Sequence, residues 1–157
     1  MKYLITGATG NLGEKVTRWL RTMTFENNIR VGIHNLKKAN KFDDLAVEKV
    51  KLDYFDLDTL QKAVSGVDLV IYIPSLTYDL QKRITEFENV LQVVKNAKAK
   101  LIFVSFFADQ ENNPFVMSPF YAYVPRRLAS SNVEYSIVKN SLYADPLVPY
   151  LEELIKR

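Results

Sequence analysis

The chain has 157 residues, 48% hydrophobic and 25% charged, a composition typical of one soluble globular domain rather than of a disordered chain. Its 21 basic and 18 acidic residues leave a net charge of +3 spread along the sequence, which is too weak to predict direct nucleic-acid binding. The absence of cysteine excludes disulfides and thiolate chemistry, and a single histidine argues against a metal site, so no metal is expected.

No targeting or membrane segment is predicted. The apolar run before the first glycine is too short for the apolar region of a signal peptide. The longest apolar run, over residues 67–76, is interrupted by Asp68 and Pro74, and it falls well short of the ~20 residues that a membrane helix needs. We therefore expect a cytoplasmic protein without a membrane partner.

Short β-rich runs alternate with segments of helical periodicity along the chain. The expected strands are residues 3–5, 29–33, 47–52, 68–73, 101–104 and 135–138. Several of these runs are continuously apolar, as is typical of parallel strands buried on both faces. Consecutive parallel strands need long right-handed return connections. The alternation therefore predicts a doubly wound, Rossmann-like α/β fold with helices on both faces of a parallel sheet, formed by residues 1–157 as one domain.

Two helices are predicted from apolar residues that recur every three or four positions. The stripe between the first two strands consists of Leu12, Val16, Trp19, Leu20 and Met23. A long helix over 79–97 is predicted from Leu80, Ile84, Phe87, Leu91 and Val94. Both stripes are expected to face the core.

The remaining elements are predicted from capping residues and prolines. A short helix is expected to begin at Asp56 or Asp58, to run to Val64 and to be closed by Gly66. A looser stretch before the next helix is predicted after the fifth strand from Pro114, Pro119 and Pro125. A final helix is expected over 149–156. Core packing rather than base stacking is expected for Phe103, Phe106 and Phe107.

Three of the five glycines fall in seven residues directly after the first strand, in the segment Thr6-Gly7-Ala8-Thr9-Gly10-Asn11-Leu12-Gly13. Between a strand and a helix, such glycines permit a tight turn, let the backbone approach a pyrophosphate and let the helix pack closely on the strand. The phosphates then meet free N–H groups at the positive end of the helix. A structural turn without a ligand is the alternative interpretation.

The end of the second strand bears on the choice of dinucleotide. An acidic residue there binds the ribose hydroxyls of NAD, whereas positive charge accommodates the extra phosphate of NADP. No acidic residue occurs between Arg30 and Phe42, but His34 and three lysines do. We therefore predict that NADPH is preferred, with NAD possible, and that Lys38 is the first choice for the phosphate contact and His34 the second. A solvated turn is the alternative explanation of the lysines.

These segments resemble the NmrA-like group of atypical short-chain dehydrogenases, particularly bacterial NAD(P)H:quinone oxidoreductases and triphenylmethane reductases. The resemblance extends over the whole chain. It is most specific in the glycine segment, in His34-Asn35-Leu36-Lys37-Lys38-Ala39 and in Asp53-Tyr54-Phe55-Asp56. Weaker matches are Gln81-x-Arg83, Asn89-Val90 and Lys139-Asn140-Ser141-Leu142-Tyr143.

The resemblance implies a nucleotide site along the ends of the strands. Asp53 and Tyr54 would lie beside the adenine, residues 73–75 would line the nicotinamide ribose, and the neighbourhoods of Ser105 and Tyr121 would shape the nicotinamide and substrate region. The complete set expected to bind the cofactor is Gly7, Thr9, Gly10, Asn11, Leu12, Gly13, His34, Asn35, Lys38, Asp53, Tyr54, Ile73, Pro74, Ser75 and Ser105. A turn or cap for Asp53, a cap for Asp56 and a polar strand end for Ser105 are the alternatives.

The sequence departs from the family at three places. His34 stands where members have arginine, residues 121–126 replace a His-x-x-Thr-Glu-Lys stretch, and the smaller substrate lobe that follows in members is absent before Arg157. A tyrosine-dependent alcohol dehydrogenase is not predicted, because Tyr123 is followed four residues later by Arg127 and not by lysine. No catalytic residue can be assigned from the sequence.

The sequence supports three functional hypotheses that share nucleotide binding. The first is an NADPH-dependent oxidoreductase that transfers hydride to a quinone or a similar small-molecule electron acceptor. The second is a non-catalytic dinucleotide sensor of the NmrA type. The third is a shortened relative of active enzymes that covers its exposed apolar surface by homo-oligomerisation. Only the first hypothesis predicts turnover of the cofactor.

Overall fold

The computed structural model describes residues 1–141, so the helix predicted over 149–156 lies outside the described residues. All strand pairs in the six-stranded sheet are parallel, and the strand order is β3-β2-β1-β4-β5-β6. The strands are β1 (Tyr3–Ile5), β2 (Ile29–Ile33), β3 (Glu48–Lys51), β4 (Leu69–Tyr72), β5 (Lys100–Phe106) and β6 (Tyr135–Asn140). The predicted doubly wound fold is confirmed.

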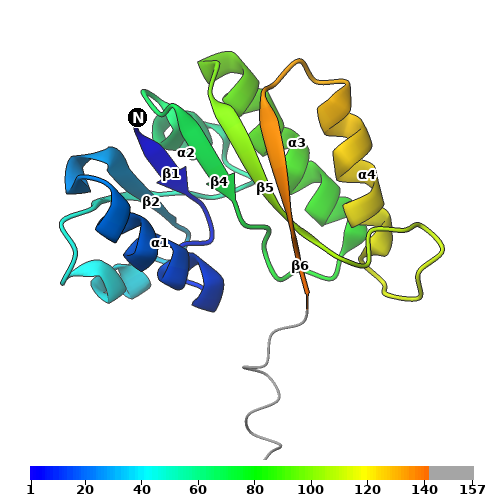
Figure 1. Cartoon of the computed structure of the whole chain (residues 1–157), viewed down its shortest axis with the longest axis horizontal. Coiled ribbons are helices and arrows are strands. Elements are labelled where there is room, and N and C mark those ends of the chain that lie inside the picture. The colour runs from blue at the N-terminus through cyan, green and yellow to red at the C-terminus, as the bar shows by residue number, and fades with distance from the viewer. Residues whose placement is uncertain (142–157) are drawn as a thin grey trace, which may run out of the picture.

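Helices cover both faces of this sheet. They are α1 (Asn11–Met23), α2 (Leu57–Val64), α3 (Leu80–Ala97) and α4 (Ser118–Ala129), with the 3₁₀ segments η1 (Glu26–Asn28) and η2 (Leu36–Phe42). Figure 1 shows α1 on one side of the sheet and α3 and α4 on the other. No helix within residues 1–141 has the length and apolar character needed to cross a membrane.

The core consists of two layers because successive strand residues point to opposite faces of the sheet. Leu4 belongs to the larger layer, which lies under α2, α3 and α4 and contains Phe87 and Phe120. Its neighbour Ile5 belongs to the smaller layer, which contains Val31 and lies under α1 and η2. The two layers hold the sheet rigidly, so the loops at the carboxyl ends of its strands are well positioned to form a site.

The apolar stripe predicted for α1 is only partly correct. Trp19 and Met23 are 68% and 75% exposed, and the residues that α1 buries are Gly13 and Thr17. The Thr17 hydroxyl donates to the carbonyl oxygen of Gly13 at 2.7 Å. Small residues lie on the buried side because the start of α1 packs against the turn after β1, where a Cβ on Gly13 would lie 2.7 Å from Cα of Ala8, whereas Trp19 lies on the exposed side of the helix.

The prolines after β5 were assigned to a looser stretch, and this prediction is wrong for two of them. Pro119 is the second residue of α4, where a missing N–H costs nothing because the first N–H groups of a helix have no intrahelical partner. Pro125 lies inside the same helix. Phe120, Val124 and Leu128 form the buried side of α4, and their burial offsets the loss of the hydrogen bond that Pro125 cannot make.

Candidate functional site

A cleft of about 1160 Å³ opens at the carboxyl ends of the strands, which point toward the lower edge of Figure 1. Residues from the loops after all six strands line it. The cleft spans the position between β1 and β4 where the strand order reverses. In open α/β sheets, ligands bind outside the carboxyl ends of the strands at such a switch point.

The glycine turn forms the floor of this cleft between β1 and α1. Gly7 has a φ of +59°, a conformation that residues with a Cβ rarely adopt. A Cβ on Gly13 would lie 2.7 Å from Cα of Ala8 and closer still to the carbonyl oxygen of Gly7. Gly10 differs, because a Cβ there would meet only the Gly7 carbonyl oxygen, at 3.3 Å. The turn therefore requires glycine at positions 7 and 13. At Gly10 the missing side chain instead leaves open space beside the start of α1.

The N-terminus of α1 is uncapped where it meets the cleft. Gly10 is its N-cap residue, and no side chain within residues 1–141 accepts a hydrogen bond from its first N–H groups. By contrast, carboxylate oxygens of Asp56 and Asp79 accept backbone N–H groups at the starts of α2 and α3. The cap predicted for Asp56 is thereby confirmed. The first turn of α1 presents free N–H groups and the positive end of the helix dipole to a ligand in the cleft.

Basic side chains line the cleft beyond β2. Lys41 forms an ion pair with Glu14 at 2.8 Å, and Nδ1 of His34 lies 3.5 Å from a carboxylate oxygen of Asp53. Lys38 also lines the cleft, and within residues 1–141 it has no ion-pair partner. Lys38 is therefore the cation on this side whose charge is not committed to another side chain.

Asn35 differs from the other predicted cofactor residues in not lining the cleft. Its side chain caps η2 by accepting a hydrogen bond from the backbone N–H of Lys37. Its assignment to the cofactor stays a prediction.

Asp53 and Tyr54, after β3, both line the cleft. Asp53 also serves as a turn residue, because its carboxylate accepts the N–H of Phe55 at 2.9 Å. The Tyr54 hydroxyl donates to the carbonyl oxygen of Ile73 at 2.9 Å, and its burial raises the pKa of that hydroxyl. Tyr54 therefore remains a neutral donor that joins the loop after β3 to the end of β4.

Ile73, Pro74 and Ser75 continue the wall after β4, and hydrogen bonds hold Ile73 and Ser75 in place. The N–H of Ile73 donates to the Thr6 hydroxyl at 3.0 Å, which ties this wall to the end of β1. The Ser75 hydroxyl donates to a carboxylate oxygen of Glu86 at 2.7 Å. Burial raises the pKa of the Glu86 carboxyl, while the Ser75 hydroxyl and the charge of Arg83 oppose the change.

Arg83 and Glu86 were missed as cleft residues. They are only 4% and 5% exposed, and both line the cleft from the first turns of α3. The sequence did contain an indication of their burial. Arg83 and Glu86 precede the buried Val90 by seven and four positions, and this helical spacing places two charged residues on a helix face that is otherwise apolar.

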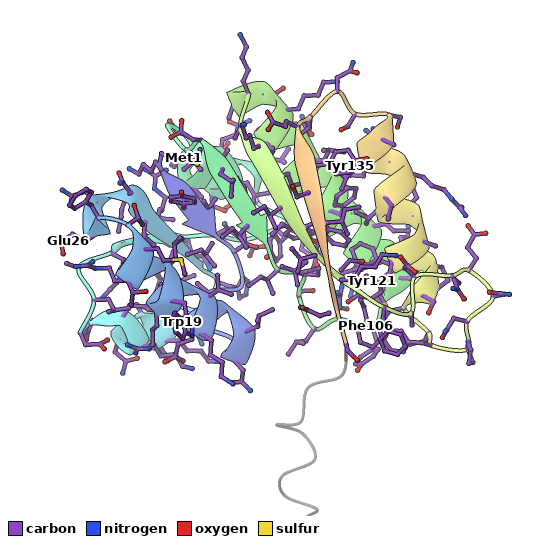
Figure 2. The ribbon with its side chains drawn as sticks, in the orientation of Figure 1. Met1, Trp19, Glu26, Phe106, Tyr121 and Tyr135 are labelled. Carbon is purple, nitrogen blue, oxygen red and sulfur yellow. The ribbon has the colours of Figure 1, made fainter. Side chains whose placement is uncertain are left out.

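Aromatic side chains form the wall beyond β5. Phe106, Phe115 and Tyr121 line the cleft, and the ring centroids of Phe106 and Tyr121 are 5.8 Å apart. Figure 2 labels Tyr121 at the lower part of α4 and Phe106 close to it, near the carboxyl end of β5. Ser105 also lines the cleft, and its buried hydroxyl oxygen has no hydrogen-bond partner in the part of the chain that the structure describes. This end of the cleft is apolar and can take a flat ring.

The tyrosine and arginine considered for an alcohol-dehydrogenase relay lie elsewhere. The Tyr123 hydroxyl donates to Glu88 at 2.8 Å, and the Arg127 guanidinium pairs with the same carboxylate at 3.0 Å. Neither side chain lines the cleft. Tyr123 is therefore not positioned to exchange a proton with a ligand there.

A model of the NmrA-like family matches residues 1–154. Quinone oxidoreductase 2 of Escherichia coli is 26% identical over 141 residues, which represent 90% of this chain and 49% of that protein.

Two solved structures have the same fold. A Staphylococcus aureus structure described as a nucleoside-diphosphate-sugar epimerase is 37% identical, with a TM-score of 0.91 over 99% of this chain and 56% of the other. Citrobacter sp. triphenylmethane reductase complexed with NADP(H) is 28% identical, with a TM-score of 0.89 over 98% of this chain and 54% of the other. The chain thus spans about half the length of these proteins.

Proposed function

This chain belongs to the NmrA-like family, and from that premise we propose that it binds NADPH in the cleft and transfers hydride to a quinone or a similar flat electron acceptor. We propose further that residues 1–157 act as one NAD(P)-binding domain. The observation that carries the proposal is the uncapped start of α1, which follows a turn closed by Gly7 and Gly13. A diphosphate supplies the negative charge and the acceptor oxygens that these free N–H groups lack.

The cleft can hold the two halves of a dinucleotide on either side of this helix start. With the pyrophosphate at the end of β1, one half extends over β2 and β3 and the other over β4 and β5, because this is the strand order. Lys38, His34 and Asp53 would meet the adenosine half. Ser75 and Ser105 would meet the nicotinamide half, beside the aromatic wall.

The protein's part in the proposed reaction is positioning. A bound nicotinamide supplies the hydride, and the chain must hold the acceptor against it. Phe106, Phe115 and Tyr121 provide an apolar wall for a flat acceptor. Reduction of a quinone leaves a delocalised anion that takes its proton from solvent, so it needs no tyrosine at the nicotinamide. Oxidation of a sugar hydroxyl does need a general base, and the location of Tyr123 and Arg127 outside the cleft argues against that chemistry.

Reversing the charge of Lys38 should change cofactor preference. We expect Lys38→Glu to weaken NADPH about 30-fold and NADH less than about threefold, because only NADPH carries the phosphate that the lysine would pair with. Fluorescence titration of each cofactor measures both affinities. Lys37→Glu makes the same charge change one residue away, outside the cleft, and should alter neither value by more than about twofold. Equal losses of NADPH and NADH affinity in Lys38→Glu would refute the phosphate assignment.

Turnover separates the enzyme from a sensor that only binds the nucleotide. NADPH absorbance should fall when a simple quinone is added and should stay constant without an acceptor. NADPH binding without acceptor-dependent oxidation by any of several quinones would favour the sensor and contradict the oxidoreductase. If the protein binds neither NADPH nor NADH, the nucleotide proposal itself fails.

A further inference from the structure

Two buried charged side chains hold the loop between β4 and α3. Glu86 accepts the hydrogen bond of the Ser75 hydroxyl at 2.7 Å, and Nη2 of Arg83 donates to the carbonyl oxygen of Thr77 at 2.6 Å. Both charged residues are at least 95% buried. Burying a charged group is costly unless it is paired or hydrogen-bonded, so these two define the loop conformation closely. Two hydrogen bonds from α3 therefore hold the wall of the cleft at Ser75.

The hydrogen bond to Glu86 determines what Ser75 can offer a ligand. The Ser75 hydroxyl has a single proton, and it donates this proton to Glu86, so no proton is left for a ligand. One lone pair of the Ser75 oxygen receives a long hydrogen bond of 3.4 Å from the N–H of Thr77. Toward the cleft, Ser75 can present only an accepting lone pair. Its ligand partner must then be a donor, either a hydroxyl or an amide N–H.

We propose that Glu86 is a positioning residue that fixes the Ser75 hydroxyl as the acceptor for a hydroxyl or amide N–H group on the nicotinamide riboside half of NADPH. This inference rests on the proposed function, because it takes the cofactor to lie across the strand ends with its pyrophosphate at α1. Ser75 follows β4, on the side of β1 opposite to Lys38, and this places it with the nicotinamide half. Glu86 acts through Ser75 and need not touch the cofactor.

The test compares NADPH with adenosine 2′,5′-bisphosphate, which lacks the nicotinamide riboside. We expect Glu86→Leu and Ser75→Ala each to weaken NADPH about fivefold, the effect of one hydrogen bond, and to leave the bisphosphate within about twofold. The double variant should be no weaker than either single variant, because both changes remove the same interaction. Calorimetric titration measures all of these affinities without requiring turnover.

Two further variants separate positioning from general support of the fold. Glu86→Gln keeps the volume and an accepting carbonyl oxygen, so it should restore NADPH affinity to within about twofold of the native chain. Glu88→Gln is the matched control on the same helix, since Glu88 contacts Tyr123 and Arg127 outside the cleft, and it should have no effect.

Several outcomes would overturn the inference. Equal losses for the two ligands in Glu86→Leu would assign Glu86 to the fold, and additive losses in the double variant would separate it from Ser75. A loss in Glu86→Gln as large as in Glu86→Leu would assign the effect to charge. If Glu86→Leu does not fold, Ser75→Ala and Glu86→Gln still decide, because native-like NADPH affinity in Ser75→Ala contradicts the proposed contact.

A native chain that binds NADPH while its variants show no change refutes this inference alone, whereas a native chain that binds no NADPH refutes the proposed function.

Discussion

Replacing Gly13 by alanine should lower the free energy of unfolding by about 3 kcal/mol, at the upper end of the usual cost of overpacking. The added methyl carbon would lie within 2.7 Å of Ala8 Cα and 2.8 Å of the Gly7 carbonyl carbon, and these backbone atoms cannot turn aside as a side chain can. The start of α1 must then move away from the turn that follows β1. Because a domain of this size is stable by only about 5–15 kcal/mol, a loss of this magnitude is large. Urea unfolding followed by circular dichroism measures it.

Gly10→Ala is the matched control within the same turn. Its methyl carbon would meet only the Gly7 carbonyl oxygen at 3.3 Å, and Gly10 has a φ of −78°, which any residue adopts. We expect its unfolding free energy to stay within about 1 kcal/mol of the native value. If Gly13→Ala and Gly10→Ala prove equally stable, the close packing of α1 on the turn after β1 does not depend on Gly13.

The order of strands and helices could be predicted because each signal is local in the sequence. β2 is a β-rich run with the bounds that were expected, and Asp79 caps α3 where the periodic pattern begins. The errors arose where tertiary contacts decide. The helical period of α1 cannot reveal that Thr17 rather than Trp19 faces the sheet, since that follows from how closely Gly13 lets the helix approach.

The candidate site was predictable where its residues form continuous segments. The glycine turn, Lys38 and Ser75 stand beside strand ends, and all of them line the cleft. Glu86 was missed because its role depends on a hydrogen bond to a residue eleven positions away.

The prediction that aromatic residues near β5 pack in the core was correct for Phe103, which is fully buried. It was wrong for Phe106, which lines the cleft, and for Phe107, which is 53% exposed. β5 runs two residues further than expected, and this carries Phe106 to the cleft.

Replacing Gly10 by leucine should weaken NADPH binding by at least about 100-fold while leaving the fold intact. Gly10 is exposed, lines the cleft and precedes the free N–H groups at the start of α1. A leucine side chain there would occupy the space through which a pyrophosphate reaches these groups, and the loss of two charge-assisted hydrogen bonds accounts for an effect of this size. Fluorescence titration measures the affinity, and the far-ultraviolet circular dichroism spectrum should match that of the native chain.

Gly10→Ala adds only a methyl group and should show an intermediate loss of NADPH affinity. If Gly10→Leu folds and binds NADPH as tightly as the native chain, the cofactor's phosphates do not lie at this turn, and the proposed nucleotide site must be abandoned.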